Sequence, residues 1–325
     1  MTSLIQVRNL VKYYPLRRSF FSGLFGGQKM GYVKAVDDVS FHVDEREIFG
    51  IVGESGCGKT TTGKLTIRLL ESTSGSVYYK DRDIMTLNKK DMNRLRAEIQ
   101  IVFQNPYESL NPRSLIRDII AEPLAVQGYC GDLEEEIAKS LEVVGLTPIE
   151  DFLYRYPHEL SGGQRQRVAI ARALVLKPRF VVADEPVSML DMSMRGGILN
   201  LMIDLKDKFN LSYLFITHDL SMAKCVCDRL AVMYLGKIVE MGATVDMIDE
   251  PIHPYVKALI EAIPDSNPRI KIGEISIRGD VPAASDIPTG CRFHPRCLYA
   301  KAPCREKEPA LREVAKGRYV ACHPQ

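Results

Sequence analysis

The sequence has no apolar run of the length that a membrane-spanning helix needs. Such a helix takes about 18–20 consecutive apolar residues, and no stretch of the 325 residues approaches this. The N-terminal stretch MTSLIQVRNLVKYYPL carries charges where a signal peptide needs its apolar core. We therefore expect a protein of the cytoplasm, in which any membrane role depends on a membrane-embedded partner.

The sequence also has little net charge, no internal repeat and no sustained heptad pattern. Its 43 Lys and Arg and 41 Asp and Glu leave a formal charge of +2, whereas a nucleic-acid-binding domain usually has a strongly basic face. We expect no nucleic-acid partner. Hydrophobic residues make up 46% of the chain, enough to bury the core of one large domain with a smaller one, or of two domains.

The residues 53–60, GESGCGKT, follow the phosphate-binding pattern G-x-x-x-x-G-K-T. An apolar run, 48–52, precedes them, and a stretch of helical character, 60–70, follows. Glycines let the backbone curl around an anion, and the helix N-terminus adds positive charge. Lys59 can reach the β- and γ-phosphates, and Thr60 can ligate Mg²⁺. The predicted phosphate-binding residues are Gly53, Glu54, Ser55, Gly56, Cys57, Gly58, Lys59, Thr60 and Thr61.

Strand and helix patterns alternate through most of the chain, which predicts an α/β fold with a mostly parallel core sheet. Residues 105–165 differ, because Pro106, Pro112, Pro123, Gly128 and Gly131 interrupt short helical patterns. We interpret that region as a helical insertion, and we place a domain boundary near residue 250. The expected strands are 4–11, 33–43, 75–79, 99–103, 180–183, 211–217 and 230–234, and the expected helices are 87–96, 161–176, 198–208, 220–227 and 253–263.

Two carboxylates end the apolar strand 180–183, as in a Walker B motif. Asp184 is suited to hold the shell of a Mg²⁺ ion, and Glu185 is suited to polarise an attacking water. The alternative is a strand that simply ends in solvated acids. The phosphate-binding loop upstream favours the catalytic interpretation.

A second anion site is predicted at Leu160-Ser161-Gly162-Gly163-Gln164. Ser161 can act as the N-cap of a helix that Pro178 ends, with Gln164 at the capping-box position. Such a helix start presents backbone N–H groups to an anion. Because one loop already holds the phosphates, a second anion site suggests that two chains meet face to face.

Together, GESGCGKT, LSGGQ and VVADEP resemble the nucleotide-binding subunit of an ATP-binding-cassette (ABC) transporter. The resemblance implies a P-loop NTPase fold of the ABC type, with an N-terminal antiparallel β region and a helical subdomain at about 105–165. It implies that Gln104 contacts Mg²⁺ and water, that His218 contacts the γ-phosphate and that Asp191 lies in the D-loop. It also places an aromatic residue on the adenine, for which Tyr14 is the candidate and Tyr13 the competitor.

The resemblance further implies a composite site. Lys59, Thr60, Asp184, Glu185 and His218 of one chain would face Ser161, Gly162, Gly163, Gln164 and Asp191 of another, with Mg²⁺ held by Thr60, Gln104 and Asp184. Soluble ABC ATPases that act on ribosomes or DNA share these motifs, but they usually carry two cassettes or a coiled-coil insertion. A non-catalytic regulatory subunit is the third class. Glu185 and His218 are intact, which disfavours it.

Four of the eight cysteines, Cys291, Cys297, Cys304 and Cys322, crowd the last 35 residues. In a reducing cytosol such a group indicates metal ligands rather than disulfides. Four thiolates could hold Zn²⁺ or a [4Fe–4S] cluster, and His294 and His323 lie nearby as alternative ligands. The spacing lacks the C-x-x-C pairs that are common in structural zinc sites.

The stretches HPYVKALIEAIP and IPTGCRFHPRC resemble the C-terminal extension of dipeptide and oligopeptide permease ATPases, here the F-type member of a pair. That resemblance implies a [4Fe–4S] cluster at the four cysteines and an extension over residues 251–325. It implies ATP-driven peptide uptake at the cytoplasmic face of the membrane. The implied partners are a second ATPase subunit, two permease subunits and an extracytoplasmic binding protein. An oligosaccharide or nickel importer with the same type of ATPase is the alternative.

A long irregular loop is expected between the first two strands, over residues 15–32. Long loops without regular structure are often functional. Phe20, Phe21 and Phe25, with Arg17 and Arg18, could touch a membrane or a partner. The alternative is a surface elaboration.

Overall fold

The structure is a computed structural model that describes residues 3–16, 31–263 and 277–323. The expected loop at 15–32 lies almost entirely outside these residues. The chain forms two compact units, one from the described residues among 1–5, 42–49 and 78–217 and one from those among 6–41, 50–77 and 218–325. None of the helices in the described ranges combines the length and hydropathy that crossing a membrane requires.

The first unit is built on parallel strands, as predicted. β7 pairs in parallel with β6 on one side and with β8 on the other, and β7 and β8 are buried throughout. Strands buried on both faces are uniformly apolar, which explains the run Phe180–Ala183. The unit contains β5 (Arg82–Asp83), η2 (Ile84–Thr86), α2 (Lys89–Leu95), β6 (Ile99–Val102), α3 (Pro106–Ser109), α4 (Ile116–Val126), α5 (Leu133–Val143), α6 (Glu150–Leu153), η3 (Pro157–Glu159), α7 (Gly162–Leu174), β7 (Phe180–Asp184), α8 (Met192–Phe209) and β8 (Ser212–Thr217).

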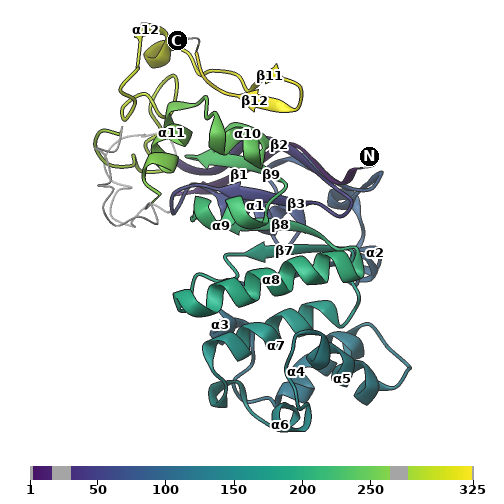
Figure 1. Cartoon of the computed structure of the whole chain (residues 1–325). Helices are drawn as coiled ribbons and strands as arrows, with labels where there is room; N and C mark the ends of the chain where they lie inside the picture. Colours follow the sequence, from purple (N-terminus) through teal and green to yellow (C-terminus); the bar gives the residue numbers. More distant parts are fainter. Residues whose placement is uncertain (1–2, 17–30, 264–276, 324–325) are drawn as a thin grey trace, which may run out of the picture. The chain divides into compact units, whose positions relative to one another are not determined.

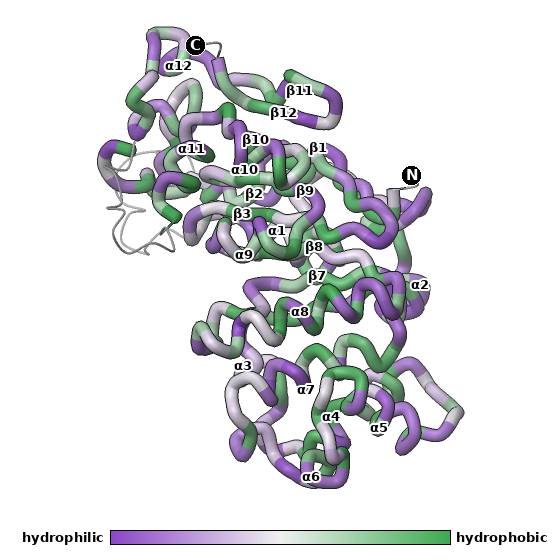
Figure 2. The backbone as a smooth tube through the Cα atoms, viewed as in Figure 1, coloured by the Kyte–Doolittle hydropathy of each residue, from purple (hydrophilic) through white to green (hydrophobic). Residues whose placement is uncertain are grey.

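Helix α7 is the centre of this unit, since it contacts α3, α4, α5, α8 and β6 (Figure 1). Hydrophobic and hydrophilic residues alternate along α7 and α8 (Figure 2), as expected for helices with one buried face. On α5 the side chains of Ile137 and Leu141 are fully buried, as is that of its C-cap residue Val144.

Several expected boundaries were wrong. Helix α4 continues through Pro123, although a proline cannot donate a hydrogen bond to the preceding turn; burial of Ile119, Ile120 and Leu124 stabilises it. Helix α7 ends at Leu174, before Pro178. Helix α8 begins at Met192, six residues earlier than the expected Ile198.

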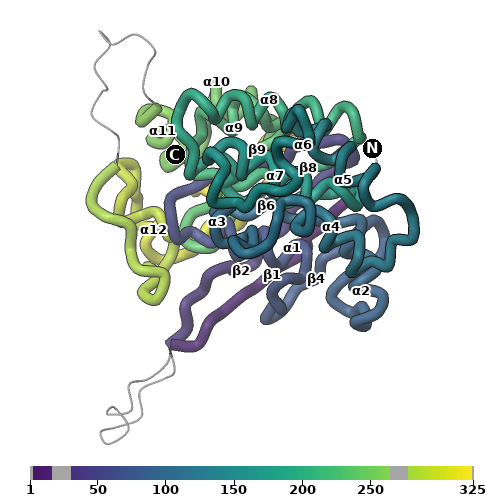
Figure 3. The backbone as a smooth tube through the Cα atoms, turned by 90° about the horizontal axis from the view of Figure 1, so that it is seen from below, coloured from purple at the N-terminus to yellow at the C-terminus, as the bar shows by residue number. Residues whose placement is uncertain are grey.

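The second unit holds most of an antiparallel region at the N-terminus. β1 (Ser3–Pro15) lies side by side with β2 (Tyr32–Asp44) and next to β4 (Ser74–Tyr79) (Figure 3). These three strands and β3 (Ile48–Val52) each run from one unit into the other. β1 and β2 are both longer than predicted.

The C-terminal part of this unit contains strands that the sequence patterns did not predict. β10 pairs antiparallel with β9 and with β12, and β12 pairs antiparallel with β11. The final hairpin therefore extends the sheet (Figure 1). The remaining elements are α1 (Lys59–Thr66), α9 (Leu220–Val226), β9 (Arg229–Tyr234), β10 (Lys237–Ala243), α10 (Thr244–Asp249), α11 (Pro254–Glu261), α12 (Ala302–Glu306), β11 (Arg312–Ala315) and β12 (Arg318–Val320).

Candidate functional site

The phosphate-binding loop connects β3 to α1 in the second unit, and two of its glycines lie against other backbone. A Cβ on Gly53 would meet the Met233 carbonyl oxygen at 2.3 Å, and one on Gly58 would meet the Ala35 carbonyl oxygen at 2.1 Å. Gly58 also has a φ of +106°, which disfavours any residue with a side chain. The loop therefore requires glycine at both positions.

The N-terminus of α1 has no side-chain cap. Its N-cap residue is Gly58, and its first turn contains no acidic residue. The Lys59 side chain is 5% exposed, and its Nζ donates to the carbonyl oxygens of Gly53 at 2.8 Å and Glu54 at 3.0 Å. No side chain of the cap competes for the first-turn N–H groups, and a cation lies at the same place. This arrangement is suited to a polyphosphate.

Cys57 is buried within the loop, and burial raises the pKa of its thiol despite the nearby Lys59 charge. A protonated, buried thiol reacts poorly. Its backbone N–H donates to the Glu54 carbonyl oxygen at 3.3 Å. These facts support the interpretation of Cys57 as a small side chain in a loop that acts through its backbone.

In the first unit, the two acids at the end of β7, Asp184 and Glu185, have different environments. Asp184 is 3% exposed, whereas Glu185 is partly exposed and has a φ of +46°. That conformation costs a residue with a side chain about 1–2 kcal/mol. Hydrogen bonds hold it, because the Glu185 N–H donates to the Ile216 carbonyl oxygen at 2.9 Å, and its own carbonyl accepts from the Ser188 N–H at 3.2 Å.

Gln104 and Glu185, predicted separately from the sequence, are in direct contact. The Gln104 side-chain amide donates to Glu185 Oε2 at 2.9 Å. The carboxylate is thus oriented by a residue that follows the neighbouring strand β6. An oriented, partly exposed carboxylate can accept a proton from a water molecule.

The predicted capping box at the start of α7 is present. Ser161 Oγ accepts from the Gln164 N–H at 3.3 Å, and the Gln164 side chain accepts from the Ser161 N–H at 2.9 Å. A Cβ on Gly163 would meet Met194 Sδ at 3.0 Å, and one on Gly162 would meet Leu190 Cδ2 at 3.4 Å. The glycines therefore let the start of α7 pack closely on the side chains of residues 190–194. Asp191, at the start of α8, is exposed.

Two arginines of α7 make contacts with α3 that the sequence did not predict. The Arg165 guanidinium lies 3.7 Å from the centroid of the Tyr107 ring and donates to the Tyr107 hydroxyl. Arg172 donates to the Ser109 carbonyl oxygen at 2.7 Å. These contacts join the segment that follows Gln104 to the helix that begins at Ser161–Gln164. The run of arginines in the α7 sequence was the only signal for them.

The two tyrosines considered for adenine stacking differ in the structure. Tyr13 donates from its hydroxyl to Asp37 at 2.5 Å, and burial with this bond raises the pKa of Tyr13 to about 12. Tyr14 is 37% exposed, and the Lys12 ammonium lies 5.1 Å from its ring centroid. Tyr14 is thus the more accessible ring. His218 is exposed at the end of β8, and the next residue, Asp219, caps α9.

The four C-terminal cysteines line one small cavity of about 20 Å³, together with His253, His294 and His323. Burial raises the pKa of Cys291 to about 11, with further contributions from Cys304, Cys322 and Cys297. His294 and His323 bond to the carbonyl oxygens of Cys291 and Lys307. The chemistry of the four thiols fits a thiophilic metal. Within the described residues, however, no three His, Cys, Asp or Glu side chains are arranged to hold a metal ion.

The comparisons with known proteins identify the family. The family described as "ABC transporter" matches residues 36–188, and that described as "Oligopeptide/dipeptide transporter, C-terminal region" matches residues 239–304. The oligopeptide transport ATP-binding protein AppF of Bacillus subtilis is 45% identical over 326 residues, which is 99% of this chain and 97% of that protein. This chain belongs to the ABC transporter ATP-binding proteins.

Other relatives agree with this assignment. The dipeptide transport ATP-binding protein DppF of Haemophilus influenzae is 45% identical over 99% of this chain and 96% of that protein. A solved ABC ATPase, dimeric in a post-hydrolysis state with ADP and Pi bound, superposes with a TM-score of 0.62 at 27% identity, over 74% of this chain and 98% of that chain. The predicted fold class, the ABC-type P-loop ATPase, is therefore confirmed, as is ATP hydrolysis coupled to transport for the family.

Proposed function

We propose that this chain is the ATP-hydrolysing subunit of an importer for dipeptides and oligopeptides. The observation that carries the proposal is the similarity to peptide-transport ATP-binding proteins over nearly the whole chain, at 45% identity. The match includes the C-terminal region, residues 239–304, for which a dedicated oligopeptide and dipeptide family exists. A cassette shared by all ABC proteins would match over the N-terminal part alone.

In the proposed mechanism the loop 53–61 binds the phosphates of ATP, with Lys59 on the β- and γ-phosphates. Thr60, Gln104 and Asp184 would hold Mg²⁺, directly or through water, which would neutralise phosphate charge, and Tyr14 would stack on the adenine. Glu185 orients the attacking water, and the Gln104 amide that contacts it at 2.9 Å sets the direction of the carboxylate. His218 contacts the γ-phosphate. Ser161, Gly162, Gly163, Gln164 and Asp191 serve the nucleotide of a second ATPase subunit.

The proposal is tested with Glu185→Gln in the assembled complex. Loss of the base should lower steady ATP turnover by about 100-fold or more, while equilibrium binding of ATP persists because the phosphate loop is unchanged. Glu142→Gln, at an exposed carboxylate of α5, is the matched control and should keep full turnover. Unchanged turnover in Glu185→Gln would remove the catalytic assignment.

The proposed partners are two membrane permease subunits, a second ATPase subunit as heterodimer partner and an extracytoplasmic peptide-binding protein. The chain would then act at the cytoplasmic face of the membrane. The helical region supports a docking role, because it exposes large side chains: Tyr107 is 58% exposed, Tyr154 68% and Val126 77%. Exposed aromatic residues are typical of contact surfaces.

We also propose that Cys291, Cys297, Cys304 and Cys322 hold a [4Fe–4S] cluster, with Zn²⁺ as the alternative. The convergence of the four thiols on one cavity supports this. Bound iron and sulfide would supply a cross-link between segments of the extension that are distant in sequence.

The cysteine proposal is tested on anaerobically purified protein by visible absorbance and metal analysis. Iron, sulfide and charge-transfer absorbance are expected, and Cys297→Ser should lose them, whereas Cys130→Ser, at an exposed cysteine, should not. A colourless protein that contains one equivalent of zinc would show that the four cysteines bind Zn²⁺ and not an iron–sulfur cluster. A protein without metal would reject both.

A further inference from the structure

The segment from Cys291 to Cys297, CRFHPRC, inserts three buried side chains among residues that come from much earlier in the chain. Arg292 and Arg296 are each 7% exposed, and Phe293 is 1% exposed. All three belong to the second unit, as do the residues that they contact. Arginine is rarely buried unless it is paired, so the partners of these two arginines indicate what the segment does.

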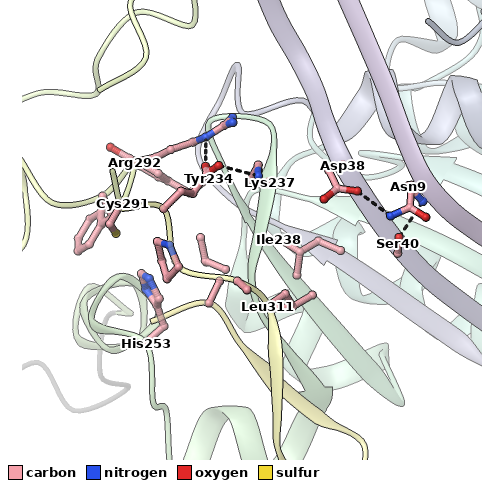
Figure 4. Close-up of a pocket in the computed structure, with 16 residues that line it drawn as sticks. Asn9, Asp38, Ser40, Tyr234, Lys237, Ile238, His253, Cys291, Arg292 and Leu311 are labelled. Carbon is pink, nitrogen blue, oxygen red and sulfur yellow. Dashed lines mark hydrogen bonds and ion pairs between the residues drawn. The ribbon is translucent and has the colours of Figure 1, made fainter. Parts of the chain in front are cut away.

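Arg292 anchors the segment to β2 and to the end of β9. It donates to Asp37, to the Leu235 carbonyl oxygen at 2.5 Å and to Glu308 at 2.8 Å. Burial alone would raise the pKa of Asp37, but hydrogen bonds from Tyr13 and Arg292 and the Arg292 charge lower it. Figure 4 shows Arg292 and Cys291 beside Tyr234 on the wall of a cavity of about 300 Å³.

Phe293 completes an aromatic cluster with Tyr234 and Tyr255. The ring centroids lie 4.8 Å apart for Tyr234 and Tyr255, and 5.3 Å apart for each with Phe293. The Tyr255 hydroxyl accepts from the backbone N–H of Glu54 at 3.1 Å. The cluster thus reaches the phosphate-binding loop itself.

Arg296 makes the second contact with the same loop residue. Its guanidinium donates to both carboxylate oxygens of Glu54, at 2.8 and 3.1 Å. A bidentate pair of this kind fixes both the charge and the orientation of the carboxylate. Glu54 directly follows Gly53, so its carboxylate belongs to a loop whose proposed ligand is a polyanion.

The charges of Glu54 and Arg296 bear directly on the binding of a nucleotide. A free carboxylate in the phosphate loop would repel a nucleotide phosphate, and the Arg296 guanidinium, whose side chain is 8% exposed against 27% for Glu54, lies close enough to cancel that charge. We propose that Arg296 is a positioning residue of the nucleotide site, which neutralises Glu54 and, together with Tyr255, holds the loop in its binding shape. The C-terminal extension thereby sets the affinity of the loop for nucleotide. This inference rests on the proposed ATP-binding role of residues 53–61.

A double-mutant cycle tests the inference on the full chain, with equilibrium binding of a fluorescent ATP analogue and of the corresponding ADP analogue. Arg296→Met should weaken ATP binding by about tenfold or more, and ADP binding by less, because ADP carries less charge. In the Glu54→Gln background, Arg296→Met should weaken ATP binding much less than it does in the unaltered chain, because no carboxylate is left there to repel the phosphates. Higher salt should reduce the loss in Arg296→Met.

Three controls make the outcome decisive. Arg305→Met removes an exposed arginine of the same extension and should change nothing. Arg296→Lys keeps the charge without the bidentate geometry, so an intermediate loss is expected, and it carries the test if Arg296→Met does not fold. Lys59→Ala should abolish binding. If Lys59→Ala still binds ATP, the proposed nucleotide site is wrong.

The inference itself is overturned by two results. The first is that Arg296→Met and Arg296→Lys bind ATP as the unaltered chain does while Lys59→Ala does not. The second is that Arg296→Met loses ATP affinity equally in the Glu54→Gln background, with ATP and ADP affected alike, since that outcome assigns Arg296 a structural role only.

Discussion

Helices α1 and α7 each have glycine at or next to their first residue, and both starts were predicted to face phosphate, yet the two helices are capped differently. Helix α1 starts from Gly58, in a left-handed conformation and without a side-chain cap, whereas α7 starts from Ser161 with a complete capping box. A capping box satisfies helix N–H groups within the chain. The start of α1 therefore depends more on an external anion than the start of α7.

The glycines at the two helix starts also differ in what they pack against. Gly53 and Gly58 lie against carbonyl oxygens of the backbone, whereas Gly162 and Gly163 lie against the side chains of Leu190 and Met194. A backbone neighbour cannot move aside, but a methionine side chain can. We infer that the phosphate loop is rigid in shape and that the start of α7 can adjust its packing.

Among the changes that test this comparison of the two helix starts, Gly58→Ala should have the largest effect. The added Cβ would meet the Ala35 carbonyl oxygen at 2.1 Å, at a φ of +106°, so the loop has to move. We expect ATP binding to fall by more than about tenfold, since each 1.4 kcal/mol of distortion is worth a factor of ten. Binding of a fluorescent ATP analogue measures this.

Gly56→Ala is the matched control within the same loop. Gly56 also has a positive φ, +79°, but a Cβ there would meet nothing within 4 Å. Gly56→Ala should lower the affinity for ATP less than Gly58→Ala does, and this smaller loss should reflect backbone strain alone. Equal losses at both positions would show that close packing does not distinguish them.

A smaller effect is expected for Ser161→Ala. Loss of the cap should lower the free energy of unfolding by about 1 kcal/mol, while ATP binding by the isolated chain, which depends on the loop at 53–61, should stay within about twofold. Urea unfolding followed by circular dichroism measures the first quantity. Asn88→Ala removes the cap of α2, where Asn88 accepts from the Asp91 N–H at 2.9 Å, and should destabilise similarly. A tenfold loss of binding in Ser161→Ala would contradict the comparison.

Elements that depend only on neighbouring residues could be predicted from the sequence. The parallel strands β6, β7 and β8 and the capping box of α7 follow from apolar runs and from residues three positions apart. The early start of α8 could not be predicted in this way. Gly196 and Gly197 disfavour a helix, and the packing of Met194 against Gly163, which stabilises the first turns of α8, depends on the fold.

Contacts between residues that are far apart in the chain could not be predicted from the sequence either. β10 contains Glu240, which is fully buried and pairs with Arg318 at 2.8 Å. Arg296 and Glu54 are 242 positions apart. Only the fold decides which arginine meets which carboxylate, so no spacing rule could have placed them. The convergence of the four cysteines was predictable, whereas the small size of their cavity was not.

The final hairpin has a consequence for biosynthesis. β12 covers the free side of β10, and β11 then becomes the outer strand, with all of its residues exposed and with Arg312 and Glu313 among them. An uncovered strand such as β10 offers unpaired amides to other chains, whereas a short, charged edge discourages such pairing. Residues 318–320 leave the ribosome after β10, so a nascent chain that has reached β10 but not β12 carries a sheet edge prone to aggregation that β12 later covers.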